Sequence, residues 1–283
     1  MIHINNFANG ALNPVMSYVV SCVGCFLGLR CTTRARAYQG AARARWLTLA
    51  ALSIGTTGIW VMHFIAMLGF AIPGETIRYN VPFTILSMLI AVIVVGIGVF
   101  IVGFSRRAGN GPLLLGGTIL GLGVASMHYI GMAAMVMPDA VRYSTALVAL
   151  SIVIAVVAGT AALWAALRLS AVWSTLAASL IMGVAVSGMH YTGIAAMRVS
   201  ASRGPGLMAG MQGGVSAQAF LLPLIIGISV LAFILTVVIS LSPTDAEIRE
   251  DAALMARISG YPHQPAQPEA AGSPPGRWLS PGA

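Results

Sequence analysis

The sequence predicts an all-α integral membrane protein with seven transmembrane helices, on the basis of its composition and its apolar runs. Of the 283 residues, 58% are hydrophobic and only 8% are charged, whereas about a quarter of the residues in a soluble domain are charged. A helix that crosses a bilayer needs roughly 20 apolar residues. Seven runs come close to or exceed this length, and they lie at residues 14–31, 46–72, 81–104, 113–137, 145–167, 172–197 and 219–241.

The first run stands alone, and the six that follow form three similar units. The first run of each unit contains a methionine–histidine pair, and the three histidines recur at intervals of 65 and 62 residues. The units span residues 46–104, 113–167 and 172–241. Internal repeats are common in membrane folds. We therefore expect one leading helix followed by three tandem helical hairpins, together forming a module over residues 1–241.

The arginines indicate how the seven helices are oriented. All fifteen basic residues are arginine: eleven lie in or beside the first, third and fifth connections or in the C-terminal tail, and four lie in the other connections. The positive-inside rule then places the N-terminus outside and the C-terminus in the cytoplasm. The net charge of +8 thus reflects membrane topology. The lipid bilayer is the expected partner of this surface, and no nucleic-acid partner is expected.

With this orientation the three histidines, His63, His128 and His190, fall at similar depth in the outer half of the membrane. An ionisable side chain inside the hydrocarbon layer is costly and by default marks a functional site. Three such side chains at equivalent repeat positions predict one shared site.

Methionines surround the predicted site. Each histidine is preceded by a methionine, namely Met62, Met127 or Met189. Helical geometry places positions +4 and +7 from the histidine on the same face, nearer the outside. The methionines at these positions are Met67, Met132, Met135 and Met197. Imidazole binds copper, zinc and iron, whereas thioether sulfur selects copper(I), so the residues favour a copper site.

Other interpretations of the same residues stay open at this point. A buried histidine can be a core residue, and methionines often only fill space. Two histidines from different helices could instead be the axial ligands of a membrane haem. Copper handling for a respiratory enzyme, without sensing, is a further alternative. An enzyme of the Ser-His-Asp type is not expected, because all seven acidic residues lie in connections, at a helix end or in the tail.

The repeated pair resembles a known family signature. Met127-His128-Tyr129 and Met189-His190-Tyr191 are similar to the motif of the bacterial MHYT domain, and Met62-His63-Phe64 resembles a degenerate copy. The resemblance covers roughly residues 10–241. It implies a multi-pass sensor in the bacterial cytoplasmic (inner) membrane, in which Met, His and Tyr bind copper near the outer face. It also implies detection of O2, CO or NO. Phe64 has no hydroxyl, so the tyrosine role falls on Tyr129 and Tyr191.

Members of this family often carry a fused output domain, and we expect none in residues 242–283. Thr244 and Glu247 form a capping-box pattern that predicts a short helix to about residue 259. Residues 260–283 are rich in Pro, Gly and Ala, and we expect them to be disordered. The sequence therefore predicts a non-enzymatic sensor that signals through a separate cytoplasmic or membrane partner.

Overall fold

The computed structural model describes residues 8–72, 77–105, 110–136, 140–200, 214–241 and 253–255. Two compact units divide at Ser240. Within the described residues, seven helices are long and apolar enough to cross a membrane, which confirms the predicted fold class. Of the tail helix expected over about 244–259, only 253–255 are described, and they are helical. The remainder of the tail, including the disorder expected over 260–283, lies outside the described residues.

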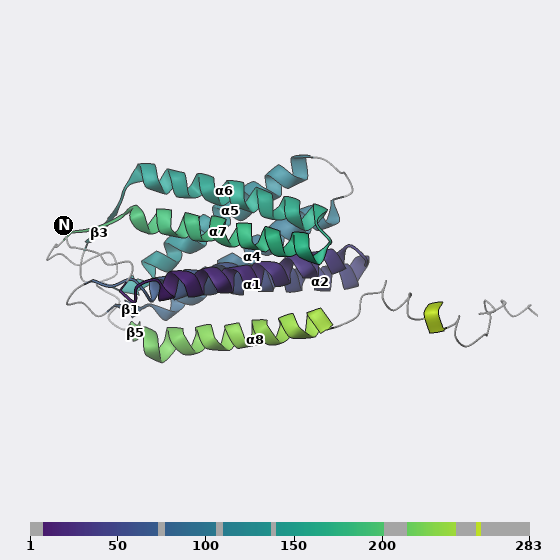
Figure 1. Cartoon of the computed structure of the whole chain (residues 1–283). Helices are drawn as coiled ribbons and strands as arrows, with labels where there is room; N and C mark the ends of the chain where they lie inside the picture. The colour runs from purple at the N-terminus through teal and green to yellow at the C-terminus, as the bar shows by residue number, and fades with distance from the viewer. Residues whose placement is uncertain are drawn as a thin grey trace, which may run out of the picture. The chain divides into compact units, whose positions relative to one another are not determined.

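The helices follow the predicted order (Figure 1). The second span changes its hydrogen-bonding pattern twice: it begins as α2, continues as the π-helical segment η1 and ends as the short helix α3. The last span likewise begins with a π-helical turn, η2. The bounds are α1 (Leu12–Ala35), α2 (Gly40–Leu52), η1 (Ser53–Val61), α3 (Met62–Met67), α4 (Val81–Phe104), α5 (Asn110–Ala133), α6 (Thr145–Arg168), α7 (Val172–Ala195), η2 (Ala217–Leu221) and α8 (Leu222–Leu241).

Six of the seven spans form a closed ring. The second span, α5 and α7 each carry one histidine and meet one another. Helix α4 packs between the second span and α5, α6 packs between α5 and α7, and α1 packs between α7 and the second span. The predicted third hairpin would pair α7 with α8, but α1 holds that position against α7. Helix α8 lies outside the ring beside α1 (Figure 1), and its Leu235 packs against the buried cluster of Leu27, Cys31 and Ala50.

Small residues let the ring close tightly. A Cβ added at Gly24 of α1 would lie 2.3 Å from the backbone nitrogen of Gly58 in η1. At the same crossing, Ser21 donates a hydrogen bond of 2.7 Å to the carbonyl of Gly58. A Cβ added at Gly121 of α5 would lie 2.4 Å from the Cα of Val156 in α6. Close backbone approach of this kind is how helices associate in a bilayer, where lipid is as apolar as the side chains.

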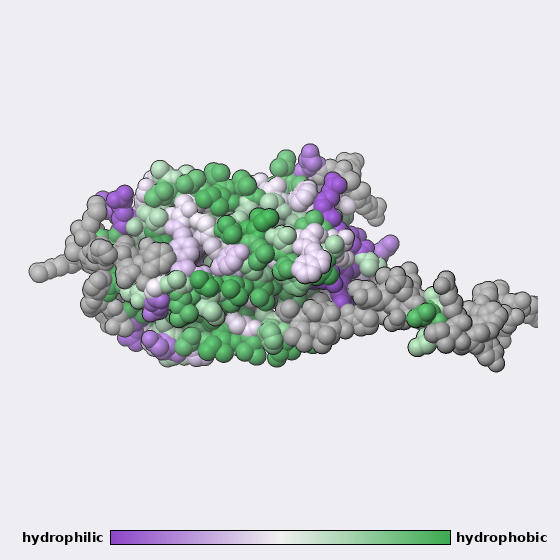
Figure 2. All heavy atoms as spheres, in the orientation of Figure 1, coloured by the Kyte–Doolittle hydropathy of each residue, from purple (hydrophilic) through white to green (hydrophobic). Residues whose placement is uncertain are grey.

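The outward surface has the banding of a membrane protein. Figure 2 shows hydrophobic side chains over the middle of the bundle and hydrophilic ones towards its two ends. Large apolar side chains are exposed on several helices, among them Ile93, Val157 and Ile181. Their exposure is favourable only against lipid tails, because a water-soluble protein rarely leaves an apolar surface of this extent uncovered.

Short strands join the connections at one end of the bundle, which we call the strand end. Strands β1 (Arg78–Tyr79), β2 (Met135–Val136) and β5 (Val215–Ser216) form an antiparallel sheet in the order β2-β1-β5, and β3 (Ala140–Tyr143) pairs with β4 (Met197–Ser200). Ala8 lies at the same end, where its N–H donates a hydrogen bond to the carbonyl of Gly69 in the connection after α3. The opposite end, where α1, α4 and α6 finish, is the arginine end.

The strands correct two predicted helix ends. The helices expected to reach residues 137 and 197 end at Ala133 and Ala195 instead. Met135 pairs with Tyr79 in the first sheet, and Met197 pairs with Tyr143 in the second. Pro138 lies just beyond the first of these ends, and a proline disfavours helical backbone in the residue before it. Neither Met135 nor Met197 therefore shares a helix face with a histidine.

Candidate metal centre

The three histidines lie near the strand end of the three inner spans. His63 is the second residue of α3, His128 lies near the end of α5, and His190 lies near the end of α7. Each is four or five residues from the end of its helix, or about 6–8 Å along the helix axis. All three side chains are buried, with at most 1% of their surface exposed.

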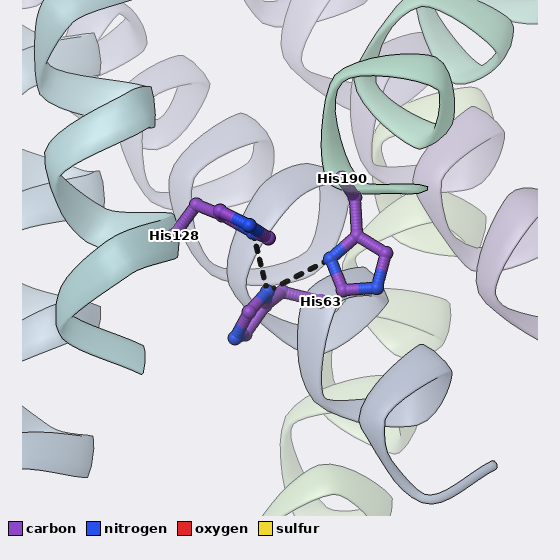
Figure 3. Close-up of side chains that lie close together, drawn as sticks. All are labelled: His63, His128 and His190. Atoms are coloured by element: carbon purple, nitrogen blue, oxygen red, sulfur yellow. Dashed lines mark hydrogen bonds between the residues drawn. The ribbon is translucent and has the colours of Figure 1, made fainter. Parts of the chain in front are cut away.

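The imidazole rings converge on one point (Figure 3). The Nδ1 atom of His63 lies 3.0 Å from Nδ1 of His190 and 3.2 Å from Nδ1 of His128. Ring centroids are 4.9–5.1 Å apart, and each pair of rings is close to perpendicular, at 84–87°. One nitrogen from each ring lies within 4.8 Å of the others. The rings are thus arranged with near-threefold symmetry, as the three repeats are.

The Nε2 sides of the His63 and His128 rings pack against glycines of the next repeat. A Cβ added at Gly131 would lie 2.5 Å from Nε2 of His63, and one added at Gly193 would lie 2.2 Å from Nε2 of His128. Both glycines stand three residues after the histidine of their own repeat, and Ala66 holds this position in the first repeat. Sequence reasoning did not assign them a role. The signal that could have done so is the glycine shared by the second and third motifs.

The triad cannot satisfy its own polar groups. A neutral imidazole has one N–H and one lone pair, and the two short contacts share the single Nδ1 of His63. The Nε2 atoms of all three rings are buried without a hydrogen-bond partner among the described residues. An unsatisfied buried polar group costs roughly 1–3 kcal/mol. Three imidazoles are therefore a costly way to fill a core. The converging Nδ1 atoms are the ones that a shared ligand could satisfy.

The methionines form buried layers around this level of the bundle. Met62, Met127 and Met189, which precede the histidines, are each 1% exposed. Met67 and Met132 lie one helical turn nearer the strand end, and Met135 and Met197 lie on β2 and β4; all four are buried in the main core. The structure thus brings the predicted methionines into the core on the histidine side of the bundle, but two of them reach it from strands.

The aromatic residue after each histidine packs edge-on against it. The ring centroids of Tyr129 and His128 are 5.0 Å apart, as are those of Tyr191 and His190, and Phe64 lies 4.7 Å from His63. The Tyr129 hydroxyl makes a 2.7 Å hydrogen bond with Ser151 of α6. It is therefore the ring of Tyr129, and not its oxygen, that contacts the triad.

An apolar cavity of about 30 Å³ lies one helical turn from the triad, towards the arginine end. Ile59, Val124 and Val186, each four residues before a histidine, contribute to its lining together with Met189. Its lining residues are all apolar or small. A cavity of this character is expected to stay dry and to accept small apolar molecules.

The fold and the triad define a class: a multi-pass membrane protein in which sequence repeats each contribute one histidine to a buried centre. Residues 57–117 and 121–179 match the family model described as MHYT, a bacterial signalling protein N-terminal repeat. The chain belongs to the MHYT family.

Three curated signalling proteins illustrate the similarity. The chain is 38% identical over 185 residues to the bifunctional diguanylate cyclase/cyclic di-GMP phosphodiesterase MucR of Pseudomonas aeruginosa, covering 64% of this chain and 27% of MucR. It is 36% identical over 195 residues to the cyclic di-GMP phosphodiesterase NbdA of the same organism, covering 67% and 24% of the two chains. For the signaling protein YkoW of Bacillus subtilis the identity is 31% over 189 residues, covering 64% and 23%.

The chain therefore spans about a quarter of the length of the curated relatives that it matches. No solved structure matches it.

Proposed function

We propose that this chain is a membrane sensor module in which His63, His128 and His190 hold one copper ion, and that its signal passes to a separate partner. The observation that carries the proposal is the convergence of three Nδ1 atoms, each from a different repeat. Every repeat then contributes one ligand to the centre. A change at the ion would act on three of the six ring spans at once.

The donor set fits a single ion. With metal–nitrogen bonds of about 2.0 Å, three nitrogens in one plane around an ion lie about 3.5 Å apart. The two short Nδ1 separations are 3.0 and 3.2 Å, so binding requires these rings to move apart by only a few tenths of an ångström. Nδ1 would be the ligand atom, and the Nε2 groups of His63 and His128 would face Gly131 and Gly193, respectively.

Charge and softness favour copper(I). None of the described residues is Asp or Glu, so an ion at the triad has only neutral ligands among them. The cost of burying an ion rises with the square of its charge, which favours a monovalent ion over a divalent one. The buried methionines offer thioethers, which select copper(I). When bound, copper supplies a centre that can change oxidation state or take a further ligand.

The geometry argues against haem. Two axial histidines place their nitrogens on opposite faces of a porphyrin, about 4 Å apart across the iron. The Nδ1 atoms of His63 and His190 are 3.0 Å apart and their rings are in contact. These two rings would have to separate before a macrocycle could enter between them, so the arrangement supports copper over haem.

The apolar cavity supports a diatomic gas as the stimulus. O2, CO and NO are small and apolar, and the cavity beside Met189 lies within one helical turn of the triad. Redox state or copper itself is the alternative stimulus at the same centre. The named activities of MucR and NbdA concern cyclic di-GMP. We infer that this chain provides a corresponding sensory region and acts through a cytoplasmic or membrane partner.

The expected result is about one copper per chain in protein purified in mild detergent, measured by elemental analysis. Because three nitrogens share the ion, His128→Gln or His190→Gln should reduce copper retention at least about tenfold, by the loss of one strong ligand. His263→Gln is the matched control, because it removes a histidine of the C-terminal tail and none of the three repeat histidines, and it should retain copper.

Stoichiometric copper in the triple His63/His128/His190→Gln protein would refute the assignment. A Soret band from stoichiometric haem in the wild-type protein would instead support the haem alternative.

A further inference from the structure

A second, larger cavity lies at the arginine end of the bundle. The histidines lie near the opposite end. The cavity volume is about 560 Å³, and the ends of α1, α4 and α6 and the beginnings of α2 and α5 surround it. Three arginines line it, each from a different element: Arg36 follows α1, Arg43 lies on α2, and Arg168 ends α6.

The arginine charges at this cavity have no counter-charge among the described residues, because none of those residues is Asp or Glu. The Nε atom of Arg43 is buried without a hydrogen-bond partner among the described residues. Its guanidinium lies over the ring of Phe104, with 5.6 Å from Cζ to the ring centroid. Arg43 is half-buried, and Arg36 and Arg168 are exposed at the mouth of the cavity. Three like charges that meet at one cavity create a positive potential there, which attracts an anion.

Further features of the lining indicate which parts of the ligand are charged and which are apolar. Arg36 is fixed in place, because it donates hydrogen bonds to the carbonyls of Leu167 and Leu169 at the end of α6. Asn110, where α5 begins, also lines the cavity, and the start of a helix carries partial positive charge. The rest of the lining is largely apolar and includes Val102, Leu113 and Trp164. A ligand that fills the cavity is thus anionic at one part and apolar at another.

We propose that this cavity binds the phosphate group of an anionic ligand, held by Arg36, Arg43 and Arg168. Guanidinium groups match phosphate oxygens in charge and geometry, and basic pockets between transmembrane helices are known to take lipid headgroups. The phosphate can come from a membrane lipid, whose glyceride part would lie on the apolar wall, or from a soluble phosphate compound. The site is independent of the copper centre.

Binding can be measured as the shift in Tm of the purified full chain in a zwitterionic detergent. The probes are dihexanoyl phosphatidylglycerol, dihexanoyl phosphatidylcholine and inorganic phosphate, each titrated at constant ionic strength. We expect saturable stabilisation by at least one phosphate anion. Arg43→Gln and Arg168→Gln should each weaken its affinity about tenfold, which is the usual effect of losing one charge-assisted hydrogen bond.

Arg45→Gln is the matched control. Arg45 lies on α2, two residues from Arg43, and is exposed outside the cavity lining, so its variant should bind as the wild type does. Stabilisation by phosphatidylglycerol but not by inorganic phosphate identifies a lipid site, and the reverse identifies a soluble ligand. Equal weakening in all three variants would show diffuse charge attraction and overturn the proposal. The absence of saturable binding would also overturn it. So would equal affinities for phosphatidylcholine and phosphatidylglycerol.

Discussion

At Gly193 the bundle has no room for a single methyl group. A Cβ there would lie 2.2 Å from Nε2 of His128, whereas real contacts of this kind begin above 3.0 Å. Gly131 meets His63 in the same way. These glycines set the position of an imidazole from the neighbouring repeat, so they act on the centre without being ligands.

Gly193→Ala should displace the His128 ring and lower the free energy of unfolding by about 1–3 kcal/mol, the usual cost of overpacking. Copper retention should fall with it. The measurements are Tm in detergent and copper content.

Gly188→Ala in the same helix is the control, because a Cβ there meets nothing within 4 Å. Replacing a helical glycine by alanine at an open position should stabilise by about 0.5–1 kcal/mol. If the two variants behaved alike, the glycine would not be positioning the histidine.

At the scale of elements, α4 and α6 are each tied to the histidine-bearing helix of the next repeat. The N–H of Asn80, before α4, donates to the Ala134 carbonyl after α5, and the N–H of Ser144, before α6, donates to the Ala196 carbonyl after α7, both at 2.8 Å. The two junctions differ in one respect. The Asn80 side chain also accepts a hydrogen bond from the Phe83 N–H, at 3.1 Å, whereas Ser144 makes no side-chain cap.

Asn80→Ala should therefore lower the free energy of unfolding by about 1 kcal/mol, the usual cost of losing an N-cap. Ser144→Ala should change it by less than about 0.5 kcal/mol, because that residue leaves no capping bond to lose. Thermal unfolding of both variants in the same detergent makes the comparison. If Asn80→Ala lost no more stability than Ser144→Ala, the cap of α4 would contribute nothing.

At the scale of the whole molecule, the strand end and the arginine end face opposite sides of the membrane. The positive-inside rule predicts that the arginine end lies in the cytoplasm. Alkaline phosphatase, which is active only outside the cytoplasm, should be active when fused after Arg203 and inactive when fused after Ser259. The opposite pattern would reverse the predicted orientation, and with it the side of the membrane nearer to the histidines.

Much of this arrangement could be predicted from the sequence, because a bilayer requires long apolar spans and makes ionisable residues within them costly. Apolar runs gave the seven spans, and the costly placement of His63, His128 and His190 indicated a shared centre before any geometry was known. The strands that hold Met135 and Met197 could not be foreseen, because two-residue ladders depend on connections that meet only in the folded bundle. The packing of α1 against α7 was missed for a related reason. The repeat pattern favours contacts between spans that are neighbours in sequence, whereas the ring is closed by a contact between the first and the sixth span.

That closing contact has a consequence for biosynthesis. Tyr18 of α1 reaches the Leu180 carbonyl of α7, and Gly183 packs against Cys22. A ribosome adds about 5–20 residues per second, so α1 waits on the order of 10 s in the membrane before α7 emerges. Until then His63 and His128 have been made but His190 has not. A nascent chain thus cannot close the ring or assemble the three histidines before the sixth span is inserted, and the proposed copper ion would be loaded only after that step.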